Sequence, residues 1–184
     1  MRKVIHQMLI SLDGYYEGPD KKLDWNNTKG EFKAYEQQLL TDADTLLFGR
    51  KTYELMEAFW PSAHAFELDP LVAGKMRDLQ KNVFSRTLNR VSWENTRLIR
   101  DNIKEEVGQL KNMPGKNILL LGSSSLALTF MDLKLIDEFH LLVNPVILGG
   151  GKTIFEGIQQ RYQLQLINGR NFSSDNVLLF YKPA

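Results

Sequence analysis

Short apolar runs alternate along the chain with segments in which apolar residues recur every three or four positions. Continuous or alternating apolar runs are typical of β-strands, whereas the second spacing places apolar side chains on one face of an α-helix. Strands are therefore predicted over residues 4–10, 45–48, 82–85, 96–99, 117–121, 138–148, 163–168 and 177–181.

The helical pattern is accompanied by residues that favour helix starts. It covers residues 31–40, follows Asp69-Pro70, follows Asp101 and begins again near Ser123. Asp is favoured as an N-cap, and Pro is favoured at the first helical position. The residues predicted to face the core from these helices are Phe32, Tyr35 and Leu39; Val72, Met76 and Leu79; Ile103, Val107 and Leu110; and Leu126, Phe130 and Leu133.

The order of these elements predicts the fold class. Residues 117–121 are almost entirely apolar, as in a strand that is buried on both faces of a sheet. The last three strands follow one another without a clear long helix between them. We therefore predict a three-layer α/β fold, in which helices cover both faces of a mixed central sheet with an antiparallel C-terminal edge.

Composition narrows the possible functions. The 184 residues suit a single domain, 1–184, and the net charge of +1 argues against a nucleic-acid-binding surface. The lack of cysteine excludes disulfides and thiol chemistry and fits a cytoplasmic location. The first apolar run is interrupted by His6 and Gln7, so we expect a core strand and not a signal peptide. No apolar run is long enough to cross a membrane. The three histidines lack the spacing of metal ligands, so no metal site is predicted.

The sequence GGGKT, residues 149–153, ends like a phosphate-binding P-loop. A P-loop also requires a glycine five positions before the Gly of Gly-Lys-Thr, and that position is Val146. The chain then meets Gly157 too soon for a helix of ordinary length. A dinucleotide fingerprint fails as well, because its last glycine would be Ile154. These glycines are therefore predicted to form a turn, and ATP hydrolysis is disfavoured.

Three other turns have the composition of phosphate sites, and each follows a predicted strand. Residues 49–52 combine a glycine, two cations and a threonine; residues 85–87 place a serine beside an arginine; and residues 122–125 place three serines at a helix start. Ligands collect at strand ends in open α/β sheets, and helix N-termini attract anions. Each turn has an ordinary alternative, as surface charge, polar loop or helix cap, but the three together favour a phosphate site.

The motifs that follow the strands resemble those of a known fold. Leu-Asp-Gly, Phe-Gly-Arg-Lys-Thr-Tyr, Ser-Arg-Thr and Leu-Gly-Ser-Ser-Ser-Leu occur in the order found in the dihydrofolate-reductase fold. The additional segment VNPVILGGGKTIFEG is similar to the reductase domain of the bifunctional deaminase–reductase of riboflavin biosynthesis and its stand-alone relatives. The resemblance extends from Val4 to about Tyr181.

This resemblance implies that NADPH binds in extended form across the strand ends, and it suggests a homodimer. Residues 49–52 would hold the pyrophosphate and adenosine side, Ser85 and Arg86 would meet the 2′-phosphate, and the 122–125 turn would direct a helix N-terminus at the pyrophosphate. The implied cofactor-binding residues are Gly14, Gly49, Arg50, Lys51, Thr52, Ser85, Arg86, Gly122, Ser123, Ser124 and Ser125.

The resemblance also implies catalytic candidates. Asp13, in the Leu-Asp-Gly turn, matches an active-site residue of the riboflavin-type reductases, although Asp-Gly is also a common turn pair. Trp25 and Glu31 occupy places similar to the tryptophan and the pterin-binding acid of dihydrofolate reductases. Glu31 is also a suitable first-turn carboxylate for its helix.

The sequence departs from the family where the substrate is concerned. Leu121 stands where the riboflavin-type domains usually have an acid before the glycine, and no arginines match those that bind the ribose phosphate. The expected function is reduction by NADPH of a small heterocycle or an imine or carbonyl group. The alternative is a non-catalytic nucleotide-binding or sensing protein that retains the cofactor cleft.

Overall fold

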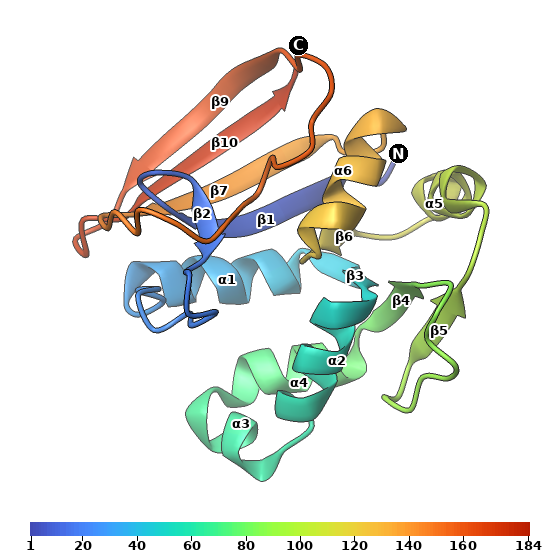
Figure 1. Cartoon of the computed structure of the whole chain (residues 1–184). Helices are drawn as coiled ribbons and strands as arrows, with labels where there is room; N and C mark the ends of the chain where they lie inside the picture. The colour runs from blue at the N-terminus through green and yellow to red at the C-terminus, as the bar shows by residue number, and fades with distance from the viewer.

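The computed structural model describes residues 1–184 and confirms the three-layer α/β architecture (Figure 1). An eight-stranded mixed sheet has the order β5-β4-β3-β6-β1-β7-β10-β9. Its strands are β1 (Val4–Ser11), β3 (Ala43–Gly49), β4 (Gln80–Phe84), β5 (Thr96–Ile99), β6 (Asn117–Leu120), β7 (Glu138–Asn144), β9 (Leu164–Asn171) and β10 (Val177–Pro183). The helices are α1 (Glu31–Thr41), α2 (Arg50–Phe59), α3 (Ala63–Leu68), α4 (Pro70–Asp78), α5 (Ile103–Asn112) and α6 (Ser124–Asp132).

The central strands are parallel and buried on both faces. In β3, Leu46 and Leu47 are fully buried but belong to opposite cores, since successive side chains of a strand point to opposite faces. One core packs α5 and α6 against the sheet, and the other packs α1, α2 and α4 against it (Figure 1). A strand inside this sandwich has no polar face, which accounts for the continuous apolar runs.

The C-terminal edge is antiparallel, as predicted. β10 pairs antiparallel with both β7 and β9, while β1, β3, β4, β5, β6 and β7 are joined by parallel ladders. No helix of the structure combines the length and apolar character that a membrane crossing requires.

The glycine run begins a small second sheet. Lys152 and Thr153 form β8 (Lys152–Thr153), which pairs antiparallel with β2 (Tyr15–Glu17), so no helix follows the Gly-Lys-Thr sequence. Gly151 has φ +125°, and a Cβ at this position would overlap the backbone carbonyl of Glu17. The glycines therefore permit a close approach of two backbones, and the predicted turn is confirmed.

Several predicted boundaries were wrong. The strand predicted over 138–148 ends at Asn144, because Pro145 has no N–H to continue the ladder. Asp101 does not cap α5: the N-cap is Asn102, with φ +56°, and the Asp101 carboxylate instead pairs with Arg86 at 3.0 Å. The sequence pattern also missed α3, β2 and β8, which are too short to show a period.

Lys81, a buried lysine at the start of β4, binds the C-terminal end of α4. The Lys81 side chain is 1% exposed, and its Nζ donates to the carbonyl oxygens of Met76, Arg77 and Leu79 at 2.8–2.9 Å. The same ammonium group lies 4.6 Å from the centre of the Trp93 ring. Burial lowers the pKa of Lys81 to about 8. These contacts satisfy carbonyl groups that the end of a helix leaves free.

Replacing Lys81 with methionine should keep the side-chain volume but leave these carbonyls without their donor. We expect the free energy of unfolding to fall by about 2 kcal/mol, measured by urea denaturation. Lys104→Met, at an exposed position of α5, is the control. Equal effects of the two substitutions would show that the Lys81 contacts add no stability.

Candidate active site

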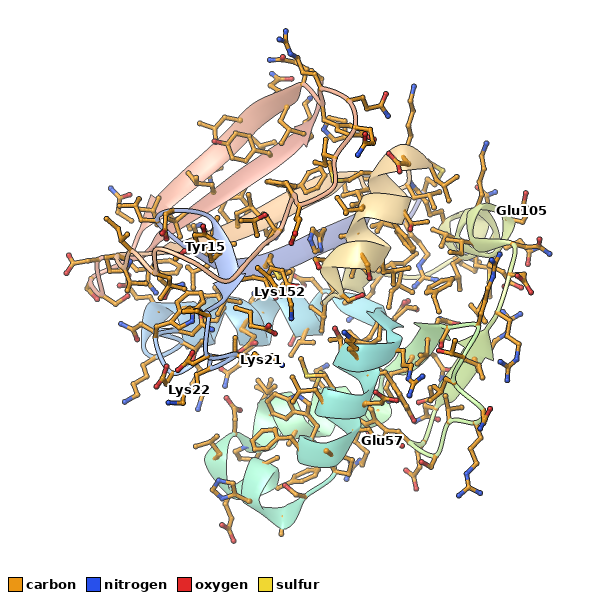
Figure 2. The ribbon with its side chains drawn as sticks, in the orientation of Figure 1. Tyr15, Lys21, Lys22, Glu57, Glu105 and Lys152 are labelled. Atoms are coloured by element: carbon orange, nitrogen blue, oxygen red, sulfur yellow. The ribbon has the colours of Figure 1, made fainter.

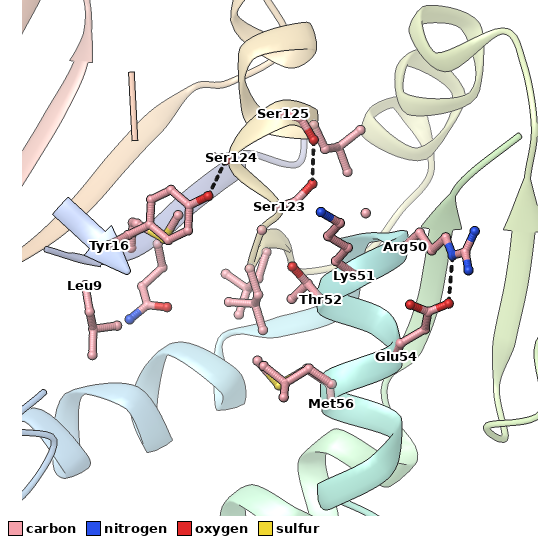
Figure 3. A pocket seen from close by; sticks show the side chains of 18 of the residues that line it. Leu9, Tyr16, Arg50, Lys51, Thr52, Glu54, Met56, Ser123, Ser124 and Ser125 are labelled. Carbon is pink, nitrogen blue, oxygen red and sulfur yellow. Dashed lines mark hydrogen bonds and ion pairs between the residues drawn. The ribbon is translucent and has the colours of Figure 1, made fainter. Parts of the chain in front are cut away.

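A cavity of about 1200 Å³ opens at the carboxyl ends of β3 and β6, between α1, α2 and α6 (Figure 3). It is lined by residues of two of the three predicted phosphate turns, Gly49–Thr52 and Gly122–Ser125, and by side chains of β1, α1 and α4. The parallel pairing of β3 with β6 brings the two turns together, because both strands end at the same edge of the sheet.

The two turns are in direct contact. The Gly49 N–H donates to the Gly122 carbonyl at 2.9 Å. A Cβ on Gly49 would overlap the Ser123 hydroxyl and lie 3.2 Å from the Ser123 backbone nitrogen. Gly122 has φ +118°, a conformation that side-chain-bearing residues rarely adopt, and a Cβ there would approach Thr52. Both glycines are therefore required for the approach that places the starts of α2 and α6 at one cavity.

Hydroxyl groups and one unpaired cation gather at these helix starts. Ser123 Oγ lies 2.9 Å from Ser125 Oγ, and Ser124 Oγ donates to the Tyr16 hydroxyl at 3.0 Å. Lys51 extends toward Ser123 and is free of ion pairs within the chain (Figure 3). Uncapped backbone N–H groups, hydroxyls and a free ammonium group form a favourable environment for a phosphate.

The third predicted turn reaches the cavity only through its last residue. Thr87 lines the cavity and accepts a hydrogen bond from Arg50 Nη1 at 3.0 Å, while Arg50 Nε donates to Glu54 at 2.7 Å. Ser85 Oγ accepts from the Thr87 and Leu88 N–H groups and so closes the turn. The Arg86 side chain is 80% exposed and points to Asp101, outside the lining.

Asp13 also lies outside the cavity lining. Its carboxylate accepts from the Ser11 hydroxyl at 2.6 Å and from the Leu148 and Gly149 N–H groups at 3.1 and 2.8 Å. The bond from Ser11, with these amides, lowers the pKa of Asp13. The next residue, Gly14, has φ +86° and forms the turn. Asp13 thus joins the turn after β1 to the glycine loop, residues 148–151, which follows β7.

Trp25 and Glu31 are likewise engaged elsewhere. Trp25 Nε1 donates to the Lys22 carbonyl in the loop before α1. The Glu31 carboxylate accepts from the backbone N–H and hydroxyl of Ser173 at 2.6 and 2.7 Å, which lowers its pKa. The structure therefore does not bring either side chain to the cavity.

Glu36 is the carboxylate that α1 does contribute to the cavity, and it was not among the residues predicted from the sequence. Phe32, Glu36 and Leu40 are spaced by four residues and share one helix face, on which both neighbours are buried. The Glu36 carboxyl has no hydrogen-bond partner in the chain, and burial, aided by the charge of Asp69, raises its pKa to about 7. The sequence signal that could have identified Glu36 is its position between Phe32 and Leu40, on the apolar face of the predicted helix.

The β2–β8 sheet contributes a further wall. Tyr16, Glu17 and Lys152 line the cavity, and the Lys152 ammonium group is paired with the Glu17 carboxylate. Figure 2 shows Lys152 between β2 and α6. The glycine loop thus borders the site through packing, and its lysine is already neutralised.

The raised pKa of Glu36 predicts a pH dependence of stability. Between pH 4.5 and about 7 the native state binds more protons here than the unfolded state, so its stability falls as pH rises through this window. The wild type should therefore be less stable at pH 8 than at pH 5 by up to about 3 kcal/mol because of this group. Glu36→Gln should lack that decrease, as measured by denaturant unfolding at the two pH values. Glu105→Gln, on the exposed face of α5 (Figure 2), is the control. Parallel wild-type and Glu36→Gln profiles would contradict the prediction.

Known proteins resemble this chain in sequence and in fold. The chain is 37% identical over 180 residues to the protein YyaP of Bacillus subtilis (strain 168), covering 98% of this chain and 94% of YyaP. Its structure is similar to a diaminohydroxyphosphoribosylaminopyrimidine deaminase/5-amino-6-(5-phosphoribosylamino)uracil reductase of Thermotoga maritima, with TM-score 0.69, 16% identity and coverage of 100% and 57% of the two chains. It is also similar to the dihydrofolate reductase of Enterococcus faecalis complexed with NADP(H), with TM-score 0.64, 11% identity and coverage of 98% and 96%. Residues 2–178 match the model of the RibD C-terminal domain, and the chain therefore belongs to that family, with a dihydrofolate-reductase-like fold.

Proposed function

We propose that this protein is an NADPH-dependent reductase of a small heterocyclic, imine or carbonyl substrate. The observation that carries the proposal is the division of one cavity into two chemical environments. Helix starts, hydroxyls and the cations Arg50 and Lys51 lie at one end, and an apolar wall with the carboxyl of Glu36 lies at the other. The family and the neighbouring reductase structures support the same reaction class.

The residues at the polar end fit a dinucleotide. The two glycines leave the turn backbones uncovered, and Thr52 and Ser123–Ser125 supply hydroxyl donors beside two helix starts. These groups would hold the pyrophosphate, and Arg50 with Thr87 would lie toward the adenosine phosphate. When bound, the reduced nicotinamide supplies a hydride.

Glu36 is the residue we assign to the proton. A carboxyl whose pKa is about 7 is protonated in half of the molecules near neutral pH, and it can therefore both hold and release a proton there. The apolar side chains that α1 and α4 contribute to the lining, Leu39, Leu40, Val72 and Met76, would limit water at the substrate end, while the nearest charges, Lys33 and Asp69, are paired with each other. Asp13, bonded to the loop at Leu148 and Gly149, positions the border of the site rather than donating the proton.

Fluorescence titration with NADPH, NADH and ATP tests the cofactor. We expect NADPH to bind most tightly, and Arg50→Ala to weaken NADPH about tenfold more than NADH, because only NADPH carries the adenosine 2′-phosphate, a monoester that a guanidinium can bind in bidentate fashion. Arg86→Ala is the matched comparison, and a selective loss there would assign the 2′-phosphate to Arg86. Tightest binding of ATP, or equal losses of NADPH and NADH in both variants, would contradict the assignment.

Gly49→Ala tests the contact between the two turns. Because the added methyl group overlaps Ser123, we expect the affinities for NADPH and NADH to fall together by about tenfold or more, with a smaller effect on stability. Gly108→Ala on α5, where an added methyl meets open space, is the control. Oxidation of bound NADPH in the presence of carbonyl and imine substrates separates a reductase from a binding protein, since the latter binds the cofactor without consuming it.

A further inference from the structure

Tyr16 brings a phenol hydroxyl from β2 to the cavity. Its oxygen accepts a hydrogen bond from Ser124 Oγ at 3.0 Å, so the bond joins the wall formed by β2 to the start of α6 (Figure 3). A phenol hydroxyl also has one hydrogen to donate, and in this chain that hydrogen has no acceptor. Tyr16 therefore offers an unused hydrogen-bond donor at the cavity wall.

The fold holds this donor in place. The Tyr16 ring packs against the core on the α6 side of the sheet. The backbone to either side of it is paired with β8, because Tyr15 lies opposite Thr153 and Glu17 lies opposite Lys152. A donor whose ring and backbone are both fixed loses little freedom when it binds a ligand, and it directs the ligand in one orientation.

The carboxylate next to Tyr16 in the chain does not take the phenol hydrogen. Glu17 is paired with the Lys152 ammonium group, and both residues line the cavity. The pKa of Lys152 is raised, mainly by Glu17 and to a smaller extent by Tyr16, so the ammonium group lies near the phenol. A phenol donor beside a cation favours a ligand atom that carries or gains negative charge.

Tyr16 lies at the border between the two ends of the cavity. Its partner Ser124 belongs to the phosphate turn at residues 122–125, whereas Met8 and Leu9 of β1 belong to the apolar lining. In Figure 3 the Tyr16 ring lies between Ser124 and Leu9. The free donor is therefore placed where the polar end of the cavity meets the apolar end.

We propose that Tyr16 is a catalytic residue that donates a hydrogen bond to the oxygen or nitrogen atom of the substrate's C=O or C=N group. The catalytic role rests on the proposed reductase function, whereas the binding of a carbonyl group does not depend on it. As hydride adds to the carbon atom, the electron pair of the double bond moves to the oxygen or nitrogen atom. The Tyr16 O–H stabilises the charge that develops there, and the Glu36 carboxyl supplies the proton that completes the reduction.

Acetophenone and α-methylstyrene are matched probes, since they differ only by exchange of the carbonyl oxygen for a CH₂ group. In ligand-observed NMR titrations of the full chain without cofactor, Tyr16→Phe should weaken acetophenone binding about fivefold, the loss of one neutral hydrogen bond. Binding of α-methylstyrene should not change. Tyr15→Phe, on the same strand but outside the cavity lining, is the control. Tyr16→Met replaces Tyr16→Phe if the latter does not fold.

Acetophenone that does not bind the wild type, or that binds the wild type and Tyr16→Phe equally, overturns the proposal. So does an equal loss of affinity for both probes, because that result would show a change of shape and not of hydrogen bonding.

Turnover separates catalysis by Tyr16 from support of the phosphate turn. With NADPH and a carbonyl or imine substrate that the wild type reduces, kcat of Tyr16→Phe should fall about 100-fold while NADPH affinity stays the same. A fall in NADPH affinity with kcat unchanged would show that Tyr16 only supports Ser124, and it would overturn the catalytic role. If NADPH does not bind the wild type while acetophenone binds through Tyr16, the proposed function fails and the carbonyl-binding role stands.

Discussion

The contact between Gly49 and Gly122 is the constraint on which the rest of the site depends. Two parallel strands, β3 and β6, end beside each other, and the hydrogen bond from the Gly49 N–H to the Gly122 carbonyl holds their turns at backbone distance. Side chains on either turn would separate them, because both positions are filled by the opposite turn. The helices that follow therefore start at one place, and their free N–H groups act on one ligand.

The remainder of the cavity is built at some cost to folding. Glu36 and Gln7 occupy positions where the spacing of α1 and the alternation of β1 would favour apolar residues, and neither has a partner in the chain. Buried polar groups without partners lower stability, so they concentrate where a ligand completes them. By contrast, Lys81 is more deeply buried, at 1% exposed, but its ammonium group has three carbonyl partners and lies over the Trp93 ring, as expected for a structural residue.

The glycine-rich segment, residues 149–153, ends like a P-loop but serves a structural role in this fold. Its glycines serve a close approach of two backbones, with Gly151 against the Glu17 carbonyl, and Lys152 pairs with Glu17. The segment borders the cavity through the β2–β8 sheet, to which Tyr16 adds its bond with Ser124. Asp13, after β1, and the loop residues Leu148 and Gly149, after β7, are thus joined at the edge of the site, while the phosphate turns lie elsewhere.

The sequence alone determined the fold class, the central strands and the two principal turns, because burial on both faces and helix periodicity are local patterns that survive without tertiary information. It also pointed to residues 49–52 and 122–125, since a glycine with hydroxyls or cations directly after a buried strand is a combination typical of anion-binding turns. Only the tertiary structure decided which polar residues share the cavity. Glu31 and Glu36 are both acids of α1, yet one is bound to Ser173 and the other faces the cavity, a difference set by packing against segments far away in the chain. Arg86, which the sequence placed at the cofactor, lies outside the cavity lining for the same reason: exposure and hydrogen-bond partners belong to the assembled fold, and no local pattern specifies them.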